Sequence, residues 1–310
     1  MIKQRIVEIW SKSTAIMRSR GKWVGYALTA LAVVYLGGVL LYSGFKIPAI
    51  DWNAYLLASL ATLGLYLISL LLQFFVWARL FSFYHRVGWR DLEIYARMIL
   101  VRRLPGGIWH WFGRATLYTA TTSVRTEIVL YGNLMEWGML ILVAGGISVI
   151  ELLATSIGVR VLLSVLMVGG AIALAVGWQP HTRAWWLRIA EAALWLLLYG
   201  VAWLIGGIIL YLVASASGVN QLNWATSIGV WSLAGGVSMI ITIVPVIGVQ
   251  EVSLVFLLQP YLPASVALLV ALLLRLLFTL SDVLWGLTGW AFASIALRKK
   301  TTPLDENILR

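Results

Sequence analysis

Long apolar stretches that carry almost no charge recur along this chain and limit the folds open to it. The core of a lipid bilayer offers no water to backbone N–H and C=O groups, so only helices and closed barrels can span it. Hydrophobic residues make up 61% of the chain and charged residues 11%, far from the balance of a soluble domain. The sequence therefore predicts an all-α, polytopic helical membrane protein with about six full spans and two broken re-entrant helical hairpins.

The expected full spans are the apolar stretches that reach about 18 residues or more. They are 23–45, 52–77, 127–150, 160–177, 191–213 and 264–297. Trp52 and Trp77 bracket the second span, and we expect both to anchor it at the membrane interfaces. The last stretch is too long for one straight crossing, so we expect it to be tilted, kinked or divided.

Two further stretches are interrupted by proline and glycine, which end helices. The first has pieces at 91–104 and 108–122, each too short to span. The second has an apolar piece at 225–244 and a short one that ends at Leu258. We interpret both as broken hairpins that return to the side from which they enter, with tips that approach each other near the midplane. The break residues are Pro105, Gly106, Gly107, Pro245 and Gly248.

Basic residues set the expected orientation and domain layout. The formal net charge is +11, and most Lys and Arg fall on segments that this topology places on one side. By the positive-inside rule, we expect a multi-pass protein of the cell membrane with both termini in the cytoplasm. Residues 1–22 form a basic cytoplasmic segment that is retained rather than cleaved, 23–297 the transmembrane domain, and 298–310 a polar tail.

Arg102, Arg103 and Arg114 flank the first break, and His110 lies between them. Backbone N–H groups freed at a break, next to guanidinium groups, suit a phosphate. We therefore expect half of a binding site for an anionic lipid headgroup at this point. The open alternative is a basic patch on the cytoplasmic side that faces anionic lipid.

Four ionisable residues lie inside apolar stretches: Glu136, Glu251, Arg275 and Asp282. Such groups are costly in a membrane unless they are paired or hydrated. Arg275 and Asp282 lie on nearly one helix face but two turns apart, so each should meet a partner on another helix. Glu136 and Glu251 are the candidates for Arg275. The four residues would line the site or couple to it, and the alternatives are structural ion pairs and, for Glu251, a helix cap.

Several classes of function find no support in the sequence. The chain has no cysteine and neither a His-Glu-x-x-His nor a Gly-x-Ser-x-Gly motif, so nothing indicates an enzyme, a metal site or a cofactor. The positive charge of a membrane protein points to lipid headgroups rather than nucleic acid.

The segment Pro245-x-x-Gly248-x-Gln250-Glu251, followed by an apolar stretch and Arg275, resembles the lysylphosphatidylglycerol synthase transmembrane region, also called the flippase-like family. The block from Leu104 to Gly107, with Arg114, is similar to the first motif of that family, and Glu136 is similar in placement to its carboxylate. The chain departs from the pattern between Pro245 and Gly248, where a double glycine is common. It also lacks the soluble aminoacyl-transfer domain of the bifunctional synthases.

The resemblance implies translocation of a lipid between leaflets, often beside a glycosyltransferase. We therefore expect a flippase whose substrate is an anionic phospholipid or a polyprenyl-phosphate glycolipid. The alternatives are a non-transporting membrane partner of a glycosyltransferase and, more remotely, an intramembrane enzyme that modifies lipids.

Overall fold

The protein is described by a computed structural model. It describes residues 22–42, 51–102, 109–122, 124–153, 156–179, 184–218, 222–241 and 248–301. Within these ranges every regular element is a helix, and six helices are long and apolar enough to cross a membrane. The prediction of an all-α, polytopic membrane protein is confirmed.

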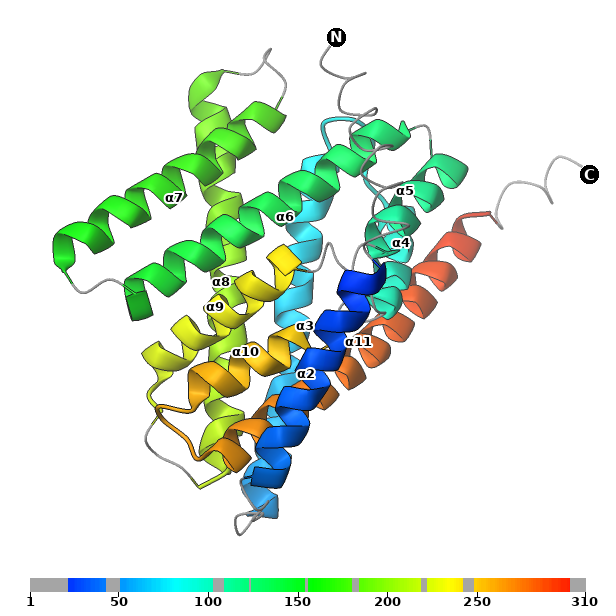
Figure 1. Ribbon diagram of the computed structural model, residues 1–310. Coiled ribbons are helices and arrows are strands. Elements are labelled where there is room, and N and C mark those ends of the chain that lie inside the picture. The colour runs from blue at the N-terminus through cyan, green and yellow to red at the C-terminus, as the bar shows by residue number, and fades with distance from the viewer. Residues whose placement is uncertain are drawn as a thin grey trace, which may run out of the picture.

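The helices follow one another with short connections (Figure 1). The first five are α2 (Lys22–Tyr42), α3 (Trp52–Phe81), α4 (Trp89–Val101), α5 (Trp109–Thr121) and α6 (Thr126–Ser148). One π-helical turn, η2 (Val149–Leu153), extends α6. The others are α7 (Ile157–Trp178), α8 (Trp185–Ala216), α9 (Trp224–Ile241), α10 (Val249–Leu258) and α11 (Ala264–Thr301).

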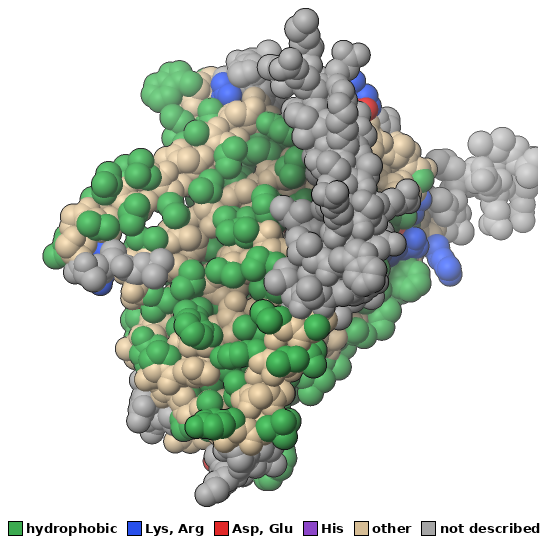
Figure 2. Space-filling model, viewed as in Figure 1, with side chains coloured by type: hydrophobic (Ala, Val, Ile, Leu, Met, Phe, Trp, Pro, Cys, Tyr) green, Lys and Arg blue, Asp and Glu red, His purple; other side chains and the backbone are tan. Residues whose placement is uncertain are grey.

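The outer surface matches a lipid environment. Large apolar side chains stand exposed on α3, α7 and α11, and Figure 2 shows hydrophobic side chains over much of the visible face. The visible Lys and Arg side chains lie towards the edges of that face. In water such a surface would drive aggregation, whereas lipid tails cover it at no cost.

The structure answers one question about the spans that the sequence left open. The final apolar segment is one continuous helix of 38 residues, α11. At 1.5 Å per residue it is roughly 57 Å long, so it extends well past a hydrocarbon core of about 30 Å. α9, which we assigned to a broken hairpin, is by length and composition also a candidate span. The described apolar part of α2, Thr29–Tyr42, is shorter than a span, so the crossing expected over 23–45 stays a prediction.

α3 and α8 form an antiparallel pair at the centre of the fold. At one end, the hydroxyl groups of Tyr55 and Ser217 lie 2.6 Å apart, and at the other, Nε of Arg79 donates to Oε1 of Glu191 at 2.5 Å. α4 follows the end of α3, and α9 follows the end of α8. The two interrupted segments therefore begin at opposite ends of the bundle.

Each interrupted segment forms a packed pair of helices. α4 packs against α5, and α10 packs against α9. In Figure 1, α9 runs towards the middle of the bundle and α10 runs back beside it. The hydroxyl of Tyr118, near the end of α5, donates to Asp91 at the start of α4, so α5 also returns to the end from which α4 began. This arrangement agrees with the expected pair of opposed hairpins.

Trp77 is not the interfacial anchor that the sequence suggested. α3 continues to Phe81, and Trp77 is fully buried, with its indole N–H donated to Tyr118 at 3.1 Å. Trp52, at the other end of α3, is 75% exposed, as expected of an anchor. A tryptophan at the end of an apolar run therefore lies inside the protein here, because α5 covers it.

Candidate functional site

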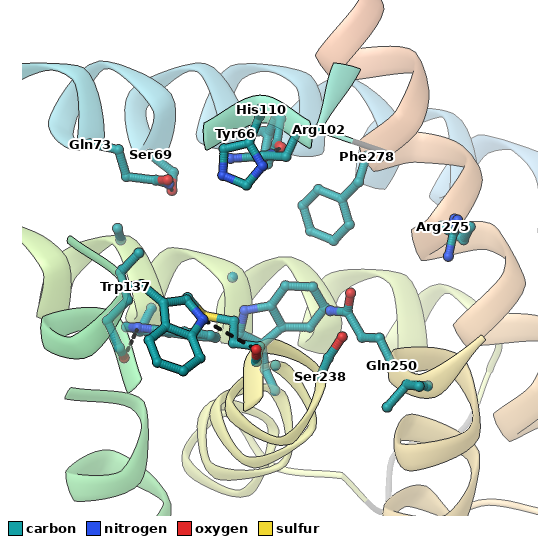
Figure 3. A pocket seen from close by; sticks show the side chains of 18 of the residues that line it. Tyr66, Ser69, Gln73, Arg102, His110, Trp137, Ser238, Gln250, Arg275 and Phe278 are labelled. Carbon is teal, nitrogen blue, oxygen red and sulfur yellow. Dashed lines mark hydrogen bonds between the residues drawn. The ribbon is translucent and has the colours of Figure 1, made fainter. Parts of the chain in front are cut away.

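The helix ends that flank both breaks border one cavity of about 310 Å³ inside the helix bundle. Arg102 and His110 reach it from the first pair, and Gly248 and Glu251 reach it from the second. α3, α6, α8 and α11 complete the wall, and Figure 3 shows Tyr66 on one side of the cavity with Trp137 and Ser238 on the opposite side. Its size lies at the lower end of ligand pockets, which span roughly 300–1,000 Å³.

Arg114 forms the most deeply buried ion pair of the cavity wall. Its Nη1 lies 2.5 Å from Oε2 of Glu136 on α6, and the two side chains are 6% and 8% exposed. The guanidinium lies 4.2 Å from the ring centre of Trp77 and 4.7 Å from that of Tyr95, where cation–π attraction adds to the charge pairing. Nη1 also donates to Oδ1 of Asn133 at 3.4 Å. This pair fixes α5 against α6.

Arg102, at the end of α4, reaches across to α11. Its Nη2 lies 3.2 Å from Oδ1 of Asp282, and it also contacts the hydroxyl of Tyr66. Tyr66 in turn donates to the same Asp282 oxygen at 2.5 Å. Asp282 is nearly inaccessible, while the side chain of Arg102 is 27% exposed. The Arg102 side chain is therefore partly accessible, and it borders the cavity.

Glu251 lies in the first turn of α10 and pairs with Arg275 of α11 at 2.5 Å. The side chain of Arg275 is 36% exposed, whereas that of Glu251 is 7% exposed. Gly248 precedes the helix with φ +92°, a left-handed conformation that favours glycine. A Cβ at Gly248 would also lie 3.2 Å from Ala32 of α2. The glycine thus permits both the turn and the close packing that bring Glu251 into the cavity wall.

The structure brings most of the expected site residues together. Arg102, Arg114, His110, Glu136, Glu251, Arg275 and Gly248 all border the cavity, and Asp282 contacts Arg102 just behind it. Of the two carboxylates expected for Arg275, Glu251 is the partner, while Glu136 pairs with Arg114 instead. Five expected residues lie outside the described part of the chain: Arg103, Pro105, Gly106, Gly107 and Pro245.

Sequence reasoning missed the uncharged polar groups that hold these ion pairs. Tyr66 bridges Arg102 and Asp282, and Asn133 joins Arg114 to the backbone carbonyl of Trp111 through a bond of 3.2 Å. One signal was available, because Asn133 precedes Glu136 by one helical turn and shares its face. A lone tyrosine in an apolar helix gives no such signal.

A second polar cluster, formed by Asp91, His85 and Tyr118, lies between the start of α4 and the end of α5. Asp91 accepts from Tyr118 at 2.7 Å and from the backbone N–H of Gly88 at 2.8 Å, and Nε2 of His85 lies 2.9 Å away. Burial raises the pKa of Asp91, but His85 and these hydrogen bonds outweigh it, so the pKa lies below its usual value. Through Tyr118, which accepts the indole N–H of Trp77, this cluster is connected to the ring on which the guanidinium of Arg114 lies.

Among the described residues, no group of three or more His, Asp or Glu side chains is arranged to hold a metal ion. The cavity instead offers guanidinium, carboxylate and indole groups, which bind anions, cations and apolar or hydroxylated groups respectively. No family model, curated protein or solved structure matches this chain.

Proposed function

We propose that this protein is a lipid flippase, which moves a lipid with a phosphate in its headgroup between the two leaflets of the cell membrane. The observation that carries the proposal is the ionic cavity between the ends of two broken helix pairs that begin at opposite ends of a membrane-spanning bundle. Irregular backbone and buried charge at membrane depth are tolerated where they line a functional cavity.

The dimensions of the cavity suit a headgroup rather than a whole lipid. A volume of about 310 Å³ has no room for two acyl chains. The apolar outer faces of the bundle are already suited to lipid tails. In our proposal the headgroup passes through the interior while the tails stay in the bilayer.

The proposed movement is alternating exposure of the cavity to the two sides. Each helix pair begins at its own end of the bundle and contributes to the cavity wall, so opening one pair at a time would expose the headgroup to one leaflet at a time. Arg102 and Arg275 have more exposed side chains than Arg114, and they would receive the phosphate. Arg114, Glu136 and Asp282 would hold the wall around them.

The resemblance of the two break segments to the flippase-like family supports a lipid with a phosphate in its headgroup as the class of substrate. The charge bias of the sequence supports cytoplasmic termini.

The test is lipid transfer in proteoliposomes that contain only this protein. Phosphatidylglycerol and phosphatidylethanolamine, each labelled on an acyl chain with a fluorophore that dithionite quenches, report transfer between leaflets. We expect the wild type to move at least one of them. Arg102→Gln should abolish transfer, Arg102→Lys should retain part of it, and the exposed control Arg125→Gln should leave it unchanged.

Equal transfer by wild type and Arg102→Gln would refute the site. Absence of transfer of both lipids by correctly folded wild-type protein would refute flippase activity for phospholipids. Copurification with a glycosyltransferase in that case would favour the non-transporting partner.

A further inference from the structure

Among the described residues, the charged side chains around the cavity form balanced pairs. Each of its three described guanidinium groups has a carboxylate partner. The pairs are Arg102 with Asp282, Arg114 with Glu136, and Arg275 with Glu251. A cavity built only to attract an anion would leave guanidinium groups unpaired, and the described part of the wall does not.

This balance decides which headgroups the cavity accepts. A headgroup with a net negative charge would bring an uncompensated charge next to ion pairs whose carboxylates are only 2–8% exposed, which is unfavourable. A zwitterionic headgroup brings none. It can also exchange with a protein ion pair, because its phosphate replaces the carboxylate and its ammonium replaces the guanidinium.

The pair of Glu251 and Arg275 is the one arranged for such an exchange. Oε1 of Glu251 binds Arg275, but Oε2 is buried and has no hydrogen-bond partner among the described residues. A buried carboxylate oxygen without a donor is unfavourable, and an ammonium group would satisfy it. The side chain of Glu251 is 7% exposed and that of Arg275 is 36% exposed, and both border the cavity, so Arg275 is the partner that would turn aside.

We propose that the cavity selects a zwitterionic phospholipid headgroup with a primary ammonium group, as in phosphatidylethanolamine, over an anionic one. The phosphate binds Arg275, and the ammonium group donates to Glu251. The proposal rests on the proposed function and specifies its substrate class. One protein ion pair is thereby exchanged for two protein–lipid ion pairs, and the total charge inside stays the same.

The experiment is native mass spectrometry of the full chain, purified with an equimolar mixture of phosphatidylethanolamine and phosphatidylglycerol. We expect the wild type to retain phosphatidylethanolamine over phosphatidylglycerol by about ten-fold or more. Glu251→Gln leaves Arg275 without its counter-charge, so the preference should reverse towards phosphatidylglycerol. Glu251→Asp keeps the charge on a shorter side chain and should retain part of the preference, and the exposed control Glu127→Gln should not change it.

A third probe tests the role of Glu251 as an acceptor. Phosphatidylcholine is zwitterionic, but its quaternary ammonium has no N–H to donate. It should be retained less than phosphatidylethanolamine, and equal retention would overturn the hydrogen bond to Glu251.

Wild-type protein that retains phosphatidylglycerol as well as or better than phosphatidylethanolamine, or that retains neither, overturns the proposal. So does a folded Glu251→Gln variant with the wild-type ratio; if that variant does not fold, the wild-type ratio decides. The proteoliposome assay separates this result from the fate of the proposed function. Transfer with a preference for phosphatidylglycerol would support flippase activity and overturn the proposed selectivity. Selective retention of phosphatidylethanolamine without any transfer would support the selectivity and overturn flippase activity.

Discussion

Replacing both members of the Arg114–Glu136 pair should be far less harmful than replacing either one. The two side chains are 6% and 8% exposed and lie 2.5 Å apart. Removing one partner of a buried pair leaves the other charge uncompensated, which costs about 3–5 kcal/mol. Arg114→Met also gives up its contacts with the rings of Trp77 and Tyr95, worth about 0.5–2 kcal/mol.

The double variant, Arg114→Met with Glu136→Leu, leaves no buried charge behind. Apolar replacement of a complete buried pair is often neutral, so we expect a loss of about 0–2 kcal/mol. Simple addition of the single effects, including the ring contacts of Arg114, would give about 6.5–12 kcal/mol. The coupling energy between the two positions should therefore exceed about 4 kcal/mol.

The assay is unfolding by SDS in mixed micelles, followed by tryptophan fluorescence, for the wild type, both single variants and the double variant. Single variants with losses below about 1 kcal/mol would show that the pair is hydrated and weak. A double variant as unstable as the sum of the singles would refute the reasoning about uncompensated charge. The stable double variant should still fail to transfer lipid, because the cavity wall has lost a charged pair.

Three further outcomes follow from the structure. A Cβ at Gly207 would overlap the backbone of α9, so Gly207→Ala should destabilise the protein by about 1–3 kcal/mol, while Gly37→Ala, in open space, should be neutral in the same SDS assay. The folded pKa of Asp91 is depressed, so its contribution is present above the unfolded value near 3.8 and is lost as pH falls through the folded value. Asp91→Asn should therefore cost roughly 1–3 kcal/mol at pH 7, with a smaller difference from the wild type below about pH 4, and a constant difference would contradict this. Because the chain has no cysteine, the variants Thr121→Cys and Asn223→Cys can be labelled selectively with a membrane-impermeant maleimide. We expect Thr121→Cys to react from the cytoplasmic side of the membrane and Asn223→Cys from the opposite side. Labelling of both variants from one side would contradict the opposed helix pairs.

The sequence predicts the helices and the residues of the site better than it predicts their partners. Proline and glycine mark breaks by local chemistry, so the ends of α4 and the start of α10 could be placed from the chain alone. Charged residues inside apolar segments point to the site for an equally local reason, the cost of burying charge. Glu136, Glu251 and Arg275 were all found in this way.

The pairing of those residues depends on how each helix is rotated, and packing between helices sets that rotation. Glu136 was a candidate for Arg275, yet it faces Arg114, because α6 packs against α5 and that pair completes the wall between them. Trp77 was misjudged for a similar reason. Its position at the end of an apolar run suggested an interface, and only the cover provided by α5 makes it an internal residue.

The most direct measurement is photo-crosslinking from inside the cavity. A benzophenone amino acid replaces His110 on the first helix pair or Gln250 on the second, and each variant is irradiated in nanodiscs that contain phosphatidylethanolamine. The same substitution at Phe256, which is 65% exposed, is the outward-facing control. Phospholipase C cleaves the lipid between glycerol and phosphate. A headgroup adduct then leaves phosphoethanolamine on the protein, whereas a tail adduct leaves diacylglycerol. We predict headgroup adducts at both cavity positions and only tail adducts at the control. Tail adducts alone, or no adducts at His110 and Gln250, would contradict a cavity that receives a lipid headgroup.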